Sequence, residues 1–240
     1  MVKFQQGGVT VNVFQIKLKV FLLKDIKLED YQEIISAFID TGMSKDNRLL
    51  EFHQSNKFKG YCFDALYPIE ENKVYKKDNI YTVTIRTIDK DLADFFSNKL
   101  VNEFNDNLKG LTSEIRILPK KHIEKLYSIT PVIIKNSEGY WKGKISLEEF
   151  ERRLKINLIK KYNDITDSKI DENFEFYSTI EFKNKKPIAA KYKNVKLLGD
   201  KISLNISENE NAQKLAYMSL GTGIFEMNAR GFGFANYRWL

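Results

Sequence analysis

One of the two histidines in this chain lies in a setting that suits acid–base chemistry. An imidazole has an ordinary pKa of about 6.5, so it can accept or donate a proton near neutrality. His53 stands in the polar segment 50–60, which we expect to be a loop after the first helix, and Lys57 and Lys59 follow it closely. Two lysines beside an imidazole can neutralise an anionic group while the ring moves a proton. The residues alone leave open whether His53 is a catalytic group or an ordinary surface histidine.

The other candidate ligands and nucleophiles are sparse. His122 follows Lys120 and Lys121, where we expect a linker or a peripheral contact. Cys62 is the single cysteine, which excludes an internal disulfide, and its place between two aromatic residues favours a buried strand. No histidine or cysteine cluster has the spacing of metal ligands. The sequence therefore predicts neither a metal nor a cofactor.

A glycine-rich segment near the C-terminus is the second feature with chemical potential. Four of the 12 glycines fall between residues 221 and 233. Glycine permits positive φ angles and close approach of the backbone to a ligand, and exposed amides in such a loop can hold phosphates. The candidate ligand-binding residues are Gly221, Gly223, Asn228, Arg230, Gly231 and Gly233.

That segment does not match two well-known phosphate-binding motifs. No Gly-Lys-Ser/Thr follows it, and Glu226 stands where a dinucleotide fingerprint needs its third glycine. A purely structural alternative is a helix end at Gly221 followed by a β-bulge at 231–233. On physical grounds the two interpretations have equal weight.

The elements that would position these residues follow a repeated order. Segment 11–22 alternates apolar and polar side chains, as a strand with one buried face does, and 28–41 has helical spacing with Gly42 as its stop. Two strands, a helix and a strand are expected to follow, at 60–67, 80–87, 91–105 and 114–118. This order is βαββαβ, a ferredoxin-like unit.

The same order recurs after Pro119-Lys-Lys121. A strand is expected at 126–135, and Ser146 opens a helix with Glu149 as its capping-box partner, ending at Lys160 and Lys161. The remaining elements are expected as strands over 174–182 and 190–206, a helix over 211–219 and a last strand over 232–239. We therefore predict an α+β protein with two tandem ferredoxin-like domains, 1–121 and 122–240.

Composition narrows the class of partner. The net charge of +7 suits a polyanion, because cations near phosphates release condensed counterions. No run of about 18 apolar residues is present, and the N-terminus lacks the apolar stretch of a secretory signal. We expect a cytoplasmic protein without membrane contact.

Segment 215–237 resembles the C-terminal signature of the CRISPR repeat-cleaving endoribonucleases of the RAMP superfamily. The shared pattern is Gly-x-Gly, a seven-residue gap and Gly-aromatic-Gly. Segment 129–134, Ile-Thr-Pro-Val-Ile-Ile, is similar to the start of that family's second domain, and the tandem βαββαβ order resembles it over nearly the whole chain.

The resemblance implies a partner and a reaction. The partner would be CRISPR repeat RNA, with membership of an effector complex left open. The reaction would be metal-independent cleavage, in which a ribose 2′-hydroxyl attacks the adjacent phosphorus and leaves a 2′,3′-cyclic phosphate and a 5′-hydroxyl. The glycine-rich segment would position the RNA, mainly through Asn228 and Arg230. A non-catalytic RAMP subunit that binds guide RNA, and a ferredoxin-like protein that binds no RNA, are the alternatives.

The resemblance also assigns roles to residues of the first half. Family members that cleave commonly carry a histidine with a lysine a few residues later, which corresponds to His53 with Lys59 or Lys57. A tyrosine near the first helix is common in family active sites, and Tyr31 is the nearest candidate, although its place in the apolar stripe favours core packing. Basic residues of the second half are candidates for backbone contacts: Lys160, Lys161, Lys183, Lys185, Lys186, Lys191 and Lys193.

Overall fold

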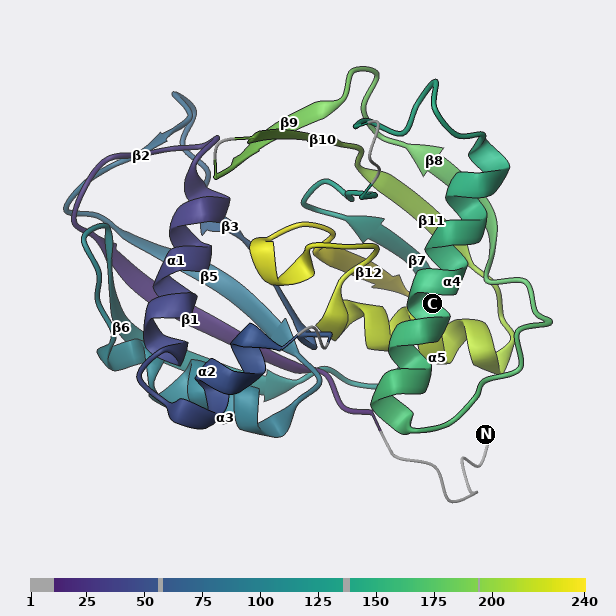
Figure 1. The fold of residues 1–240 in the computed structure, drawn as a ribbon, viewed down its shortest axis with the longest axis horizontal. Coiled ribbons are helices and arrows are strands. Elements are labelled where there is room, and N and C mark those ends of the chain that lie inside the picture. The colour runs from purple at the N-terminus through teal and green to yellow at the C-terminus, as the bar shows by residue number, and fades with distance from the viewer. Residues whose placement is uncertain (1–10, 56–57, 136–138, 194) are drawn as a thin grey trace.

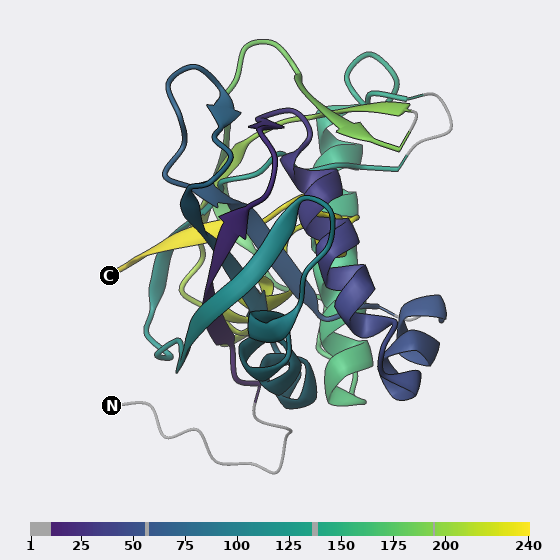
Figure 2. The ribbon, with the colours of Figure 1, turned by 90° about the vertical axis from the view of Figure 1, so that its left-hand side faces the viewer.

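The protein is an α+β structure with two antiparallel sheets side by side and helices packed against them (Figure 1). It was obtained as a computed structural model, which describes residues 11–240 except 56–57, 136–138 and 194. In the two views, α1 (Tyr31–Met43) and α4 (Leu147–Thr166) lie on the same side of the sheets (Figures 1 and 2). These two helices therefore cover the same side of the molecule.

The first sheet forms because its strands alternate buried and exposed residues. In β1, Ile16 and Leu18 are buried while Lys17 and Lys19 are exposed, as the alternating pattern predicts. The spatial order of strands is β3 (Tyr61–Tyr67), β5 (Ile80–Thr87), β1 (Phe14–Leu22) and β6 (Leu108–Ile117). This is second, third, first, fourth in chain order, the arrangement of a ferredoxin-like unit.

The helices of the first half differ from the sequence expectation in two places. Helix α1 continues through Gly42, the predicted stop, and ends at Met43; Gly42 packs against Leu100, whose side chain would lie 2.8 Å from a Cβ at this position. The predicted helix 91–105 is shorter: α3 (Lys90–Asn98) is followed by the 3₁₀ turn η1 (Leu100–Asn102). Phe104, near the end of the predicted helix, lies outside α3 and η1 and is exposed.

The second sheet repeats the same order. It runs β12 (Ala235–Trp239), β7 (Ile123–Ser128), β11 (Ile202–Ile206) and β8 (Tyr177–Phe182), which is fourth, first, third, second. Strand β6 ends and β7 begins on either side of the predicted boundary between residues 121 and 122. Two tandem ferredoxin-like folds are thus confirmed, while their behaviour as separate domains stays a prediction.

Two helices cover the second sheet. Ser146 caps α4 as predicted, its Oγ accepting the Glu149 amide at 3.1 Å. The helix does not end at Lys160 and Lys161, however, but continues to Thr166. Helix α5 (Glu210–Thr222) leads into the glycine-rich segment, which contains the 3₁₀ turn η2 (Asn228–Arg230).

Two small two-stranded sheets lie outside the two main sheets. One pairs β2 (Ile26–Lys27) with β4 (Val74–Tyr75). The other pairs β9 (Ile188–Tyr192) with β10 (Val195–Gly199), so segment 190–206, predicted as one strand, is an extra hairpin followed by β11. The hairpin reaches the first half, where Lys191 pairs with Asp30 at 3.3 Å.

Polar contacts also join the two halves at the sheets. The buried guanidinium of Arg86 in β5 donates to the Ala235 carbonyl at 2.6 Å and to Asn236 Oδ1 at 2.7 Å in β12. Tyr217 of α5 accepts from the Val13 amide and donates to the Leu118 carbonyl. Buried hydrogen bonds of this kind fix the angle between the sheets, because breaking one leaves a buried polar group without a partner. Among the described residues, no helix is long and apolar enough to cross a membrane.

Candidate active site

His53 lies on a short helix rather than in the predicted polar loop. Helix α2 (Asn47–Gln54) begins after Asp46, whose carboxylate accepts the amides of Arg48 at 3.0 Å and Leu49 at 3.1 Å. The expectation of a loop was wrong because only Leu49 of this helix is buried, so the segment shows almost no apolar periodicity. The Asp46 cap is the signal that would have revealed it.

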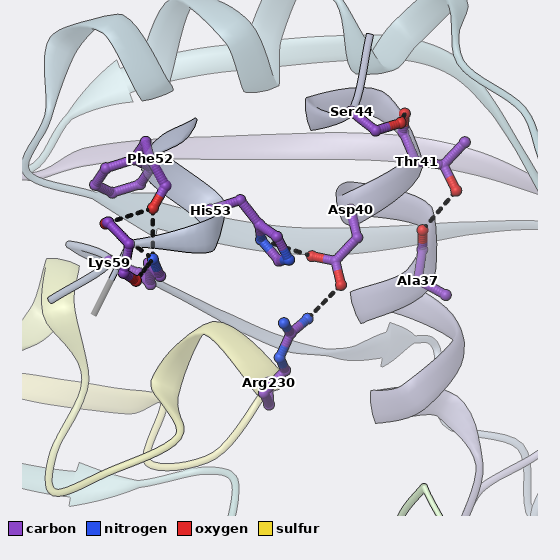
Figure 3. A network of polar contacts seen from close by, with 9 residues as sticks. Ala37, Asp40, Thr41, Ser44, Phe52, His53, Lys59 and Arg230 are labelled. Atoms are coloured by element: carbon purple, nitrogen blue, oxygen red, sulfur yellow. Dashed lines mark hydrogen bonds and ion pairs between the residues drawn. The ribbon is translucent and has the colours of Figure 1, made fainter. Parts of the chain in front are cut away.

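A carboxylate connects His53 to the glycine-rich segment (Figure 3). Asp40, near the end of α1, places its Oδ1 3.5 Å from His53 Nδ1. Its other oxygen, Oδ2, accepts a hydrogen bond from Arg230 Nη1 at 2.6 Å. The three side chains are each about one quarter exposed, at 26% for His53, 30% for Asp40 and 22% for Arg230. The fold thus brings the candidate histidine of the first half to the candidate cation of the second half.

Arg230 is held firmly in its charged form. Burial acts to lower the pKa of the guanidinium, but the charge and hydrogen bond of Asp40, with smaller contributions from Tyr61 and Tyr192, raise the pKa overall. Tyr192 belongs to the unpredicted hairpin β9–β10, so this hairpin borders the site. A planar cation in this position is suited to bind phosphate oxygens.

Lys59 also lies at the site, where it holds the end of α2. Its Nζ donates to the carbonyls of Phe52 at 2.5 Å and Ser55 at 2.7 Å, and it lies 4.9 Å from the centroid of the Phe52 ring. Partial burial, followed by the nearby charge of Arg230, lowers the pKa of Lys59. The lysine therefore stabilises the helix that carries His53. Lys57 lies outside the described residues.

Tyr31 belongs to the core of the first half. Its side chain is 8% exposed, and burial raises the pKa of its hydroxyl, with added effects from the charges of Asp64 and Tyr75. Those neighbours lie on β3 and β4, whereas the His53 contacts come from α1. The environment favours the core-packing interpretation, and a catalytic role for Tyr31 stays a prediction.

The glycines of the C-terminal segment serve close packing. Gly221 lies inside α5 against Ile88, and Gly223 rather than Gly221 ends the helix. Gly231 has a φ of +81°, and a Cβ there would come within 2.6 Å of the Phe63 ring. Gly233 has a φ of +65°, and its Cβ would overlap the Ile224 carbonyl at 2.0 Å. Larger residues at Gly231 and Gly233 would displace the loop.

Asn228 and Lys161 form the inner support of the loop. The Asn228 amide donates to the carbonyls of Ile224 at 2.9 Å and Phe232 at 3.0 Å. The Lys161 ammonium donates to Asn228 Oδ1 at 2.8 Å and to the carbonyls of Gly223 and Phe225. Both side chains are buried, so the expectation that Lys161 faces RNA was wrong. Direct contact of Asn228 with RNA stays a prediction, and its buried bonds favour a role in shaping the loop.

The loop is attached to the first half at more than one point. Gln32 of α1, which is buried, donates from Nε2 to the Gly231 carbonyl at 2.8 Å. Asp40 holds Arg230 two helical turns further along the same helix. Sequence reasoning missed Gln32 and Asp40 and gave Lys161 the wrong role, because nothing in a single sequence marks a polar residue on a helix as a partner of a distant loop.

A second feature lies where the two sheets meet. A groove of about 370 Å³ is lined there by residues of both halves, including Lys17, Arg86, Arg116, Tyr127 and Tyr237. The Arg86 guanidinium stacks 4.5 Å from the centroid of Phe234, and burial lowers the pKa of Arg86. The groove combines cations with aromatic rings. Within the described residues, no three histidine, cysteine or acidic side chains are grouped so that they could hold a metal ion.

Comparisons with known proteins show the fold and the family of the chain. No curated protein sequence matches the chain. A solved structure of a "CRISPR associated protein Cas6" is 20% identical, with a TM-score of 0.68 over 94% of this chain and 99% of the other. A Cas6-related protein from Pyrococcus furiosus is 18% identical, with a TM-score of 0.67 and coverage of 94% and 98%. A third, described as a RAMP protein binding different RNA substrates, is 17% identical, with a TM-score of 0.71 and coverage of 94% and 99%.

These likenesses show that the fold is shared. The sequence comparison goes further, because residues 113–237, more than half of the chain, match the family described as "CRISPR associated protein Cas6, C-terminal". The matched segment includes the whole glycine-rich loop with Arg230. The chain belongs to the Cas6 family of CRISPR-associated proteins.

Proposed function

We propose that this protein binds CRISPR repeat RNA and cleaves precursor transcripts into guide RNAs without a metal ion. The observation that carries the proposal is the meeting of His53 with Arg230 through Asp40, which joins a proton-transfer group to a phosphate-binding cation. Solved Cas6 proteins of the same fold include a product complex and a substrate-mimic complex, which supports RNA as the partner. The protein would act in the cytoplasm, alone or within an effector complex.

The proposed reaction uses the ribose as its own nucleophile. His53 takes the proton of the 2′-hydroxyl or supplies one to the departing 5′-oxygen, since an imidazole can do either near neutral pH. Arg230 stabilises the charge that develops on the non-bridging phosphate oxygens. Lys59 fixes the helix of His53 and adds positive charge beside it. The products are a 2′,3′-cyclic phosphate and a 5′-hydroxyl.

The groove between the sheets supports binding of the same RNA. Single-stranded RNA is held by cations along the backbone and by bases stacked on aromatic rings. Lys17 and Arg116 supply cations there, and Tyr127 and Tyr237 supply rings. The proposed roles of Gly221, Gly223, Gly231 and Gly233 are then indirect, because their packing sets the position of Arg230 next to His53.

Replacing the histidine tests the proposal most directly. In His53→Ala, the rate of single-turnover cleavage of repeat RNA should fall by about two to four orders of magnitude, the usual contribution of acid–base catalysis. The dissociation constant should change little, because the imidazole is not the main charge at the site. His122→Ala is the matched control, since the only other histidine pairs with Gln213. Unchanged cleavage by His53→Ala would place the proton transfer elsewhere.

Two substrate controls separate the mechanism from its alternatives. Cleavage should persist in EDTA and should disappear when the sugar at the cut site carries no 2′-hydroxyl. Loss of activity in EDTA would contradict metal independence. Tight binding of repeat RNA without any cleavage by the unaltered protein would favour the non-catalytic RAMP subunit instead.

A further inference from the structure

The two carboxylate oxygens of Asp40 have unequal environments. Oδ2 is bonded to Arg230 Nη1 at 2.6 Å. Oδ1 is buried and, among the described residues, has no hydrogen-bond partner, yet it lies 3.5 Å from His53 Nδ1. A buried carboxylate oxygen without a donor is costly, and a small movement of the ring would supply one. The imidazole is the group placed to satisfy it.

We infer that Asp40 is a positioning residue for the RNA cleavage, an inference that rests on the proposed function. Its carboxylate accepts the Nδ1 proton of His53 and thereby fixes the tautomer of the neutral ring. Which ring nitrogen carries the proton is set by the hydrogen bond that the other nitrogen makes. With Nδ1–H held by Asp40, the lone pair is on Nε2, which is the nitrogen that exchanges a proton with the RNA.

Asp40 also sets the distance between the two reacting groups. It comes from α1, His53 comes from α2, and Arg230 comes from the glycine-rich loop of the other half. Because the Asp40 carboxylate contacts both His53 and Arg230, it fixes the distance between these two side chains across the two halves of the chain. The charged or titratable groups around the pair are Lys59 after α2, Tyr61 on β3, Tyr192 on β9 and Arg230 on η2.

The variant Asp40→Asn gives a specific test, because Arg230 fixes how the new amide must point. The guanidinium has only donors, so the amide oxygen stays toward Arg230 and the amide NH₂ faces His53 Nδ1. That NH₂ donates to Nδ1 and moves the ring proton to Nε2, the wrong tautomer for a base. In the serine-protease triad, the equivalent loss of the carboxylate lowers the rate by about 10⁴ with the geometry intact.

The first measurement is the tautomer in the free protein. ¹⁵N chemical shifts of the two histidines should show Nδ1–H for neutral His53 in the unaltered protein and Nε2–H in Asp40→Asn, while His122 stays unchanged. Asp30→Asn is the matched control, because Asp30 is also on the α1 side and pairs with a basic residue of the second half, Lys191, away from His53. An unaltered His53 tautomer in Asp40→Asn would overturn the inference.

The second measurement is cleavage at saturating protein. The single-turnover rate of Asp40→Asn should fall at least about a hundredfold, with less than about a threefold change in the dissociation constant of 2′-deoxy repeat RNA. Adding Arg230→Met to Asp40→Asn should return the ring proton of His53 to Nδ1 in the ¹⁵N spectrum, because the amide can then rotate and accept the Nδ1 proton. A rate within threefold of the unaltered protein would overturn the inference.

The two proposals fail in different ways. If His53→Ala cleaves normally, the proposed function fails whatever Asp40→Asn does. If His53→Ala is inactive while Asp40→Asn is fully active, only the positioning role fails. The tautomer is measured without RNA, so it tests the Asp40–His53 contact separately from catalysis.

Discussion

The glycine-rich loop has two sides that are held in contrasting ways. On its inner side, the buried ammonium of Lys161 donates three hydrogen bonds, to Gly223, Phe225 and Asn228. On its outer side, Arg230 meets a half-buried carboxylate whose second oxygen has no hydrogen bond among the described residues. A buried network in which every polar group has a hydrogen-bond partner fixes the conformation of the loop. A partly exposed network with an unpaired oxygen can instead bind a ligand or take part in a reaction. The inner side of the loop therefore has a structural role, and its outer side forms part of the candidate active site.

Removing the inner support should have the largest effect. Lys161→Met leaves two carbonyls and the Asn228 oxygen without their donor, so the free energy of unfolding should fall by about 3–5 kcal/mol, because each buried acceptor without a partner costs about 1–3 kcal/mol. Urea denaturation measures it. The neighbouring exposed lysine gives the control variant, Lys160→Met, which should change stability by less than about 0.5 kcal/mol. Equal stabilities would show that the inner network does not hold the loop.

Removing the outer cation should affect activity more than stability. Arg230→Met should slow single-turnover cleavage about tenfold to several hundredfold, because one donor to the phosphate charge is lost. Unfolding should be easier by only about 1 kcal/mol, as for a partly exposed ion pair. Arg152→Met, which breaks an ion pair with Glu149 at the start of α4, is the control and should cleave normally. If Arg230→Met and Arg152→Met lowered the cleavage rate equally, Arg230 would have no specific role in the active site.

The protonation of Lys161 gives a smaller, pH-dependent effect. Burial lowers the pKa of Lys161 to about 7 from an ordinary value of 10.5. Between these values the unfolded chain keeps the proton that the folded chain has released, so stability should rise with pH by up to about 1.4 kcal/mol per unit. The useful range is pH 7–8.5, because burial raises the pKa of Cys62 to about 12, which acts in the opposite direction at higher pH. A stability curve that stays flat or falls across pH 7–8.5 would contradict this.

The smallest effect is expected at the other end of α4. Hydrogen bonds from Arg152 and Arg153 lower the pKa of the Glu149 carboxyl to about 2. This contribution is complete above about pH 4.5 and is lost as the pH falls toward 2. Glu149→Gln should therefore flatten the acid side of the stability curve only slightly, since these side chains are exposed and solvent weakens their attraction. If Glu149→Gln lowered the free energy of unfolding as much as Lys161→Met, solvent exposure would not explain why Glu149 contributes less to stability than Lys161.

Local patterns predicted much of the fold. The alternation in β1 and the Ser146 cap of α4 are visible in the sequence because each depends on neighbouring residues. Local patterns were insufficient where the ends of an element depend on which of its residues are buried. Helix α2 has a single buried residue, and α4 continues past two lysines, one of which is buried beneath a loop that begins 62 residues later in the chain. Hairpin β9–β10 was merged with β11, since three short strands in succession read as one apolar segment.

For the site, the sequence by itself supplied the residue types: an imidazole, lysines nearby, and a glycine-rich segment with an arginine. Those assignments needed only the ordinary chemistry of each side chain and a family pattern. Only the tertiary structure decided that His53 and Arg230 meet at Asp40, that Lys161 faces inward, and that the glycines serve packing. The physical reason is that contacts between residues 190 positions apart depend on how two sheets and their helices pack, and no local pattern encodes that geometry.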